Sequence, residues 1–479
     1  MISKNFIYYF TLIFLSVFFN YFTYDEAWFY YVSDNYFYNK NLLSFHNERF
    51  SNPIYAVFLS KINFIKDINF FFVNRFFSLL AIIFSFYLIN FILIRKFNLC
   101  KNYFIFGHFL FAFWFCFHEG GMSARVDSII SFCIVFFLFS IIKLQESIFF
   151  FIASTILNFL LILLHPNIIP LIFLNILVFI FFFKKKLFNF PILFLIIVFI
   201  VYFTKYHFFE IIDSYNEGVA HYTHGNMTTL LDLNLYFESI KKDIFFQGRF
   251  RHLYNFYPFT FYILIFNYFL IFIHLIWIKD FKNKYFNFFI LLFFLWNIFF
   301  LLSPTKLSHH FAIIFALLSL ILPFILFSIA QKLKSILNIK IMLNFFSYIN
   351  LILIFLISFK ALYYFNNNYF LFKLLDKYFE VSHYIFFNKL SKSEIIIQSI
   401  NDKMRNKTFY GNPEFKYVFD KANYLGNNSQ MIKEKPDFFV VYSRFEKCED
   451  YIKTFNSKYI FKVSFNINDS EWIVCEKSN

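Results

Sequence analysis

Two acidic residues, Asp25 and Glu26, directly follow the first apolar stretch of the chain. A carboxylate placed at a membrane surface can accept a proton from a hydroxyl group, which is the work of a general base. The same pair also suits the start of a helix, because Asp is a preferred N-cap and Glu is favourable in a first turn. Position alone therefore leaves catalysis and helix capping equally open.

A second polar segment, Ser303–Phe311, brings a lysine and two adjacent histidines to the start of an apolar stretch. Helix N-termini favour anions through their free N–H groups and their dipole, and Lys306, His309 and His310 strengthen that preference. Adjacent histidines point about 100° apart on a helix, so they chelate one metal ion poorly. We therefore expect this turn to bind a phosphate group.

Arg125 lies in a polar turn, residues 118–127, between two apolar stretches. Its guanidinium either pairs with Asp127 or meets an anionic phosphate, for which its planar fork is well shaped. His165 precedes a proline that most simply starts the next helix, so a functional role is the less favoured interpretation for it. The expected further substrate contacts are Trp28, Asp127, His165 and Arg249.

The composition predicts an integral membrane protein. Of 479 residues, 60% are hydrophobic and 15% charged, whereas a soluble globular chain has roughly 25% charged residues. The net charge of +15 does not indicate nucleic-acid binding, because Lys and Arg cluster between apolar stretches, where they set membrane orientation. The 89 phenylalanines indicate compositional bias, not a stacking function, since Phe is as soluble in a bilayer as Leu.

A bilayer is crossed by about 20 mostly apolar residues, and the orientation follows from the basic loops. Positive charge fills the even-numbered gaps, which predicts a cytoplasmic N-terminus and places residues beyond 360 outside. Two outside loops, 24–69 and 205–258, are too long to be simple connectors. Residues 27–38 predict an interfacial helix, because Trp and Tyr favour that depth. The eleven expected spans are 5–23, 70–94, 102–118, 128–142, 148–164, 167–183, 190–204, 259–278, 285–302, 310–329 and 341–360.

Beyond the spans, residues 361–479 carry mixed charges at the density of a soluble domain. Cys448 and Cys475 could pair there if that domain lies in an oxidising compartment, but the sequence leaves the pairing open. We therefore expect an all-α polytopic membrane domain, residues 1–360, followed by a small extracytoplasmic α/β domain. Its expected elements are strands at 437–443, 459–465 and 472–475 and a helix near 446–456.

Together these features resemble the GT-C glycosyltransferases, a class that includes protein mannosyltransferases and aminoarabinose transferases and uses polyprenyl-phosphate sugars. The resemblance lies in an acidic pair opening the first outside loop, many spans and a soluble outer tail. The turn with Pro304, Thr305, Lys306 and the His-His-Phe run ending at Phe311 is similar to one in the mycobacterial cell-wall arabinosyltransferases. Leu307 stands where those enzymes carry Trp, so the resemblance implies the reaction type and not arabinose.

The resemblance implies that Asp25 is the catalytic base, that Glu26 is its partner, and that His309 and His310 face the donor phosphate. The chemistry of the residues leads to a compatible set of roles. A carboxylate accepts the proton of the acceptor hydroxyl, and fixed positive charge from Arg125 and the 303–311 turn stabilises the departing phosphate. A divalent cation bridging carboxylate and phosphate is compatible with this set without being required, and the metal ligands stay unknown.

The expected activity is inverting transfer of a sugar from a polyprenyl-phosphate donor to a hydroxyl of a glycan, lipid or protein acceptor. The resemblance implies the outer face of a bacterial inner membrane. A transporter or flippase for lipid-linked saccharides is one alternative, although such proteins favour ionisable groups and broken helices at mid-membrane. An O-antigen-type polymerase or ligase is another, and the acidic pair favours the transferase over it. A membrane scaffold without enzymatic activity is the third.

Overall fold

The structure is a computed structural model. It divides the chain into two compact units, which are described separately. The expected spans 5–23, 102–118 and 190–204 and the interfacial helix 27–38 lie outside the described residues, and spans 167–183 and 341–360 are described at one residue each. The described residues are 70–95, 127–143, 147, 149–162, 174, 233–245, 247–256, 258–278, 283–302, 311–333, 355, 392–411, 415, 418–425, 435–443, 447–450, 457–467 and 470–478.

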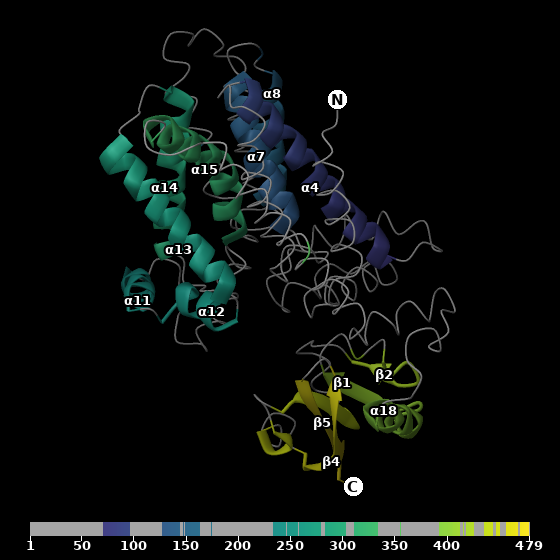
Figure 1. Cartoon of the computed structure of the whole chain (residues 1–479). Coiled ribbons are helices and arrows are strands. Elements are labelled where there is room, and N and C mark those ends of the chain that lie inside the picture. Colours follow the sequence, from purple (N-terminus) through teal and green to yellow (C-terminus); the bar gives the residue numbers. More distant parts are fainter. Residues whose placement is uncertain are drawn as a thin grey trace. The chain divides into compact units, whose positions relative to one another are not determined.

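In the first unit, α4 (Phe70–Arg95) and α7 (Asp127–Lys143) meet through aromatic side chains, and α4 crosses α7 at an angle (Figure 1). The ring centroids of Phe84 and Phe132 lie 6.3 Å apart, and two helical turns further along both helices those of Phe91 and Phe139 lie 5.3 Å apart. Contacts that advance equally along two helices require a parallel pair. The C-terminal ends of both helices, each with a basic residue, therefore lie together.

Helix α8 (Phe149–Ile162) returns antiparallel to α7. The Ser147 N–H donates to the Lys143 carbonyl at 2.8 Å, which closes the connection between the two helices. Just beyond it, the rings of Phe139 and Phe150 meet edge to face at 5.3 Å. The positions of α4, α7 and α8 coincide with three of the expected spans.

A second group of helices contains α13 (Pro258–Ile273), which continues as the π-helical turn η4 (His274–Ile278), α14 (Lys284–Leu302) and α15 (Phe311–Leu333). The side chain of Asn283 caps α14, because its Oδ1 accepts the N–H groups of Tyr285 and Phe286 at 3.0 and 3.1 Å. These helices also coincide with expected spans.

Aromatic contacts give the directions of these helices. The His274 ring lies 5.0 Å from that of Phe286 near the start of α14 and 6.4 Å from that of Phe324 in the second half of α15. Near the C-terminal ends of η4 and α15, the Lys332 ammonium donates to the Trp277 carbonyl at 2.6 Å. Helices α13 and α15 therefore run parallel, and α14 runs antiparallel to both.

Two of the described helices, over 75–94 and 260–278, are long and apolar enough to cross a bilayer. One face of α13 is exposed and aromatic, with Tyr262, Phe266 and Phe272 among its side chains. Such a face suits lipid better than water. The crossing of a membrane by eleven spans stays a prediction.

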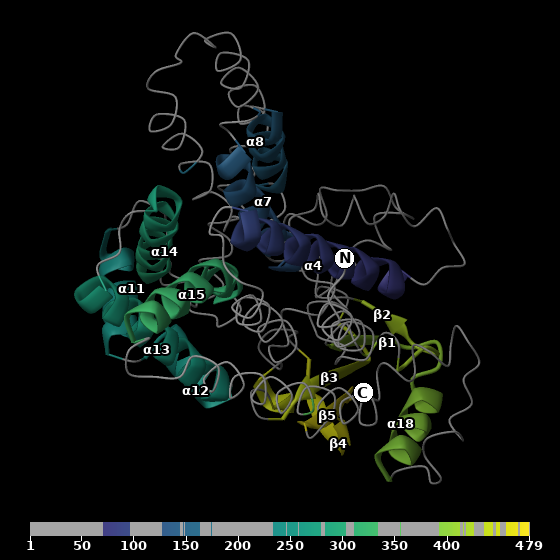
Figure 2. The ribbon, with the colours of Figure 1, turned by 45° about the horizontal axis from the view of Figure 1, so that its top comes forward.

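Two short helices precede α13 in the loop expected over 205–258. Helix α11 (Leu233–Ile244) packs against α14, and α12 (Arg249–Phe256) leads into α13 (Figure 2). The scattered apolar residues of 230–246 indicate partial order in this loop, and α11 lies there.

The second unit contains α18 (Lys392–Lys403) and a five-stranded sheet in the order β2-β1-β3-β5-β4. The first three strands in that order are parallel, and β5 is antiparallel to both of its neighbours. Strands β3, β4 and β5 coincide with the expected strands, whereas β1, β2 and α18 were not expected. The strands are β1 (Thr408–Gly411), β2 (Asn423–Tyr424), β3 (Phe438–Tyr442), β4 (Tyr459–Ile467) and β5 (Ser470–Lys477).

Side chains of the central strand β3 are buried on both faces of this sheet. Phe438 and Val440 join an aromatic cluster that α18 covers, while Phe439 packs with Tyr459 on the other face. Where a helix was expected near 446–456, the structure has a 3-10 turn at Cys448–Asp450, and residues 451–456 lie outside the described part. Cys448 is held there by a disulfide to Cys475 of β5.

Candidate functional site

Most of the predicted site residues lie outside the part of the chain that the structure describes. Their convergence around one donor phosphate therefore stays a prediction. Two predicted substrate contacts, Asp127 and Arg249, are described in their backbone as the first residues of α7 and α12. The undescribed residues are Asp25, Glu26, Trp28, Arg125, His165, Lys306, His309 and His310.

One predicted neighbourhood can be followed in the structure. The ring of Phe250, the residue after Arg249, lies 5.5 Å from the ring of Phe311 at the start of α15. Phe311 is the final residue of the predicted phosphate turn. Helix α12 therefore begins beside the end of that turn, although the two segments are far apart in the sequence.

Arg75 of α4 is a buried ionisable residue that sequence reasoning did not single out. Its side chain is fully buried, as is that of Ser78 one turn later, and both have interaction partners in the structure. Burying a guanidinium is costly unless it is paired, and buried ionisable groups in membrane helices mark functional sites. A single Arg near the end of an expected span is ordinarily a snorkelling residue, so the signal is its burial and not its position.

Arg75 lies on α4 nine residues before Phe84, whose ring is 6.3 Å from that of Phe132 in α7. Asp127, the last residue of the turn expected to carry Arg125, is the first residue of α7.

Buried hydrogen-bonding groups of α7 and α8 lie close to this end of α7. Ser131 Oγ and both polar atoms of the Asn158 side chain are buried and make no hydrogen bond with any residue that the structure describes. Ser131 lies eight residues before Phe139 on α7, and Asn158 lies eight residues after Phe150 on α8. Because the two helices are antiparallel and meet at Phe139 and Phe150, Ser131 and Asn158 lie at the same level along the pair. Each unmet buried polar group costs about 1–3 kcal/mol, which natural proteins rarely tolerate without a use.

Metal ligation finds no support in the described residues, which contain no group of three or more His, Cys, Asp or Glu side chains that could hold an ion. The divalent cation considered from the sequence would involve Asp25, which lies outside that part.

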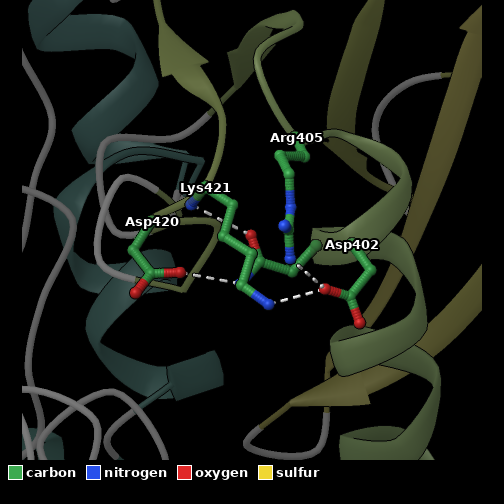
Figure 3. Close-up of polar contacts among 5 residues, drawn as sticks. Asp402, Arg405, Asp420 and Lys421 are labelled. Carbon is green, nitrogen blue, oxygen red and sulfur yellow. Dashed lines mark hydrogen bonds and ion pairs between the residues drawn. The ribbon is translucent and has the colours of Figure 1, made fainter.

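A charged cluster in the second unit is a structural brace (Figure 3). The Asp402 carboxylate of α18 accepts from Lys421 Nζ at 2.5 Å and from Arg405 at 3.4 Å. The Asn401 amide donates to Asp420 at 2.7 Å. The hydrogen bond from Lys421 lowers the pKa of Asp402. All three charged groups of the ion pairs are exposed, so the cluster joins α18 to the segment before β2 and contributes little energy.

Deeper in this unit, burial and then the charge of Asp437 raise the pKa of Tyr459 to about 12. The Tyr459 hydroxyl donates to the Pro436 carbonyl at 2.7 Å. Asp437 Oδ2 accepts both the N–H and the hydroxyl of Thr408 at 2.9 Å. The Thr408 bonds join the neighbouring strands β1 and β3, and the Tyr459 bond joins β4 to the segment before β3 across the intervening β5, so both have a folding role.

Comparison of the chain with family models, with curated proteins and with solved structures finds no match.

Proposed function

We propose that the chain is an inverting membrane glycosyltransferase of the GT-C type, with its site at the outer face of the membrane. It takes a sugar from a polyprenyl-phosphate donor and transfers it to an acceptor hydroxyl. Asp25 accepts the proton of that hydroxyl. The 303–311 turn and Arg125 stabilise the phosphate as it leaves.

The single observation that supports this proposal is the fully buried guanidinium of Arg75 on α4. A lipid phosphate needs fixed cations close to the membrane surface, and a guanidinium satisfies phosphate oxygens in a planar, two-bonded geometry. The resemblance of the 303–311 turn supports the same donor chemistry.

The direct test is transfer from a radiolabelled polyprenyl-phosphate sugar by membranes containing Asp25→Asn. We expect transfer to fall at least a hundredfold with normal membrane insertion, because a positioned general base contributes about 10²–10⁴ in rate. The matched control is Glu449→Gln, which neutralises an exposed carboxylate in the second unit. Near-normal transfer by Asp25→Asn would remove Asp25 from the mechanism.

The donor side is tested separately by Lys306→Ala and His309→Ala. We expect both substitutions to raise the donor concentration needed for half-maximal transfer. If donor kinetics stay unchanged in both variants, the phosphate site lies elsewhere.

A transporter or flippase of lipid-linked saccharides is the second candidate, and one feature of α13 favours it. His274 is fully buried at the point where α13 becomes π-helical, and Asn267 two turns earlier is also buried. Buried polar groups and helix irregularities inside spans are typical of transport pathways. His274→Phe in proteoliposomes should abolish lipid flipping if this candidate holds, and should leave it unchanged if the residue only packs.

A further inference from the structure

Helix α8 buries its polar side chains and exposes apolar ones. Phe149 and Ile156 are 68% and 40% exposed, whereas Ser154 and Asn158 are fully buried. A helix on the surface of a water-soluble protein has the opposite arrangement. The hydrogen bonds of Ser154 and Asn158 must therefore come from other protein groups or from a bound molecule, because bulk water does not reach them.

Buried hydroxyl groups elsewhere in these helices are satisfied within their own helix. Each donates to the carbonyl of a residue three or four positions earlier, which is a common bond of Ser and Thr inside helices. Thr155, the neighbour of Ser154, makes such a bond, so α8 allows it. The four bonds are Ser85 to Ala81 at 2.7 Å, Ser140 to Phe137 at 2.7 Å, Thr155 to Phe151 at 2.8 Å and Ser319 to Ala316 at 2.6 Å.

Ser154 does not make this bond. Its Oγ, like the Oδ1 and Nδ2 of Asn158, has no hydrogen-bond partner among the residues that the structure describes. The hydroxyl of Ser131 in α7, at the level of Asn158, shows the same lack. So many unmet polar atoms within about one helical turn are unusual in a native protein, and a bound molecule is a common explanation.

The spacing of Ser154 and Asn158 fits one small molecule between them. Residues four positions apart share a face of a helix, and their Cβ atoms lie about 5–6 Å apart. A single atom that is hydrogen-bonded to both side chains spans about 5.6 Å, because each bond is about 2.8 Å long. One oxygen atom between the two side chains would therefore complete both.

The chemistry of this site favours a neutral molecule that both donates and accepts hydrogen bonds. The Asn158 amide carries a donor and an acceptor group, and the Ser154 hydroxyl can act as either. Helix α8 has no ionisable residue, and those of α7, Asp127 and Lys143, lie at its two ends. Neither helix supplies the opposite charge that a buried ion needs. Water meets these requirements, and buried water typically bonds to otherwise unsatisfied groups of this kind.

We propose that an ordered water molecule bridges Ser154 and Asn158 inside the helix group of the first unit. The Asn158 Nδ2 donates to the water oxygen, and the water donates to Ser154 Oγ. Helix α8 is thus held in place partly by an internal solvent molecule. The proposal does not depend on sugar transfer. A sugar hydroxyl offers the same hydrogen bonds, so the experiment separates the two sources.

The first test is a double-mutant cycle in the full chain in nanodiscs, with thermal unfolding as the measurement. Ser154→Ala and Asn158→Leu each remove one partner of the water, so we expect each to lower the melting midpoint by about 2–4 °C. The double variant should lose less than the sum, because both changes remove the same bridge. Ser140→Ala, whose hydroxyl bonds within α7, is the matched control and should add to Asn158→Leu. A higher midpoint in Asn158→Leu overturns the proposal, since removing a dry, unsatisfied amide stabilises a protein.

The second test locates the molecule directly and stays decisive if Asn158→Leu does not fold. Cryo-electron microscopy of the full chain with a bound antibody fragment should show a density peak within about 3.2 Å of both Ser154 Oγ and the Asn158 amide. The peak should be present with and without added polyprenyl-phosphate sugar. A direct bond between the two side chains with no peak overturns the proposal. Density that appears only with the added sugar also overturns it, because the site would then belong to the substrate.

Discussion

Arg75 is the residue whose substitution best tests the donor site. Replacing it with Lys keeps the charge but removes the planar fork that binds phosphate through two bonds. We expect the donor concentration for half-maximal transfer to rise about tenfold in Arg75→Lys, with a smaller change in maximal rate. Donor titration in membranes measures this. Thermal stability must be followed in parallel, because removing one partner of a buried pair costs about 3–5 kcal/mol. Unchanged donor kinetics with lowered stability would make Arg75 a purely structural residue.

Gly411 illustrates a constraint of backbone packing. A Cβ added there would lie 2.6 Å from the Val440 carbonyl oxygen in the neighbouring strand. Gly411→Ala should therefore lower the free energy of unfolding of the second unit by about 1–3 kcal/mol. Pulse proteolysis of the full chain in urea, with Lys403→Ala as the control, measures the shift. An unchanged urea midpoint would mean that β1 and β3 can separate without cost.

Tyr459 predicts how the second unit responds to alkali. Its folded pKa of about 12 lies above the unfolded value of about 10, so the neutral form is favoured by folding. This stability is fully present below about pH 10 and is lost as the pH rises toward about 12. The urea midpoint should fall in that interval, and it should fall less in Tyr459→Phe. An identical decline in both proteins would exclude this hydroxyl as the cause.

At the scale of elements, long apolar helices could be predicted because their signal is local. Bounds of α4, α7 and α14 differ from the expected spans by a few residues at most. Strands β1 and β2 could not be predicted from the sequence, because they are short and depend on hydrogen bonding to other strands. Strand β2 pairs with β1, and β1 also pairs with β3. Helix α18 carries a run of Ile that resembles a strand, and only packing of Ile397 and Ile400 against the sheet shows its helical face.

The disulfide is the element-scale feature that bears on compartment. A closed loop with a sequence separation of 27 residues stabilises a fold by about 3–4 kcal/mol in the chain-entropy description. We expect Cys448→Ala to lower the urea midpoint of the second unit and to expose Cys475 to maleimide. Cys133→Ala, at a free buried cysteine of α7, is the control. Maleimide labelling of Cys448 in the unreduced chain would show that the bond does not form in the cell.

At the scale of the whole molecule, orientation is the decisive property. The C-terminal ends of the parallel helices α4 and α7 carry Arg95 and Lys143, as expected for a cytoplasmic edge. An impermeant maleimide should label Lys403→Cys in intact cells, and should label Lys282→Cys only after permeabilisation. The reverse pattern would place the predicted site on the wrong face.

The convergence of distant turns could not be predicted from the spans. Hydropathy indicates which segments cross a bilayer, but the choice of neighbours depends on side-chain packing. The contact between the rings of Phe250 and Phe311 is an example of packing that hydropathy does not indicate. The predicted site residues share one expected membrane face because of the alternation of loops, and their distances stay a prediction.

The position of β5 has a consequence for biogenesis. Residues 470–477 lie between β3 and β4, so neither of those strands has its full set of partners until that segment arrives. The sheet can therefore be completed only after the ribosome has synthesised these residues. Until then β3 has an unpaired edge and Cys448 lacks its partner, and a nonsense mutation before Ser470 would leave this state permanent.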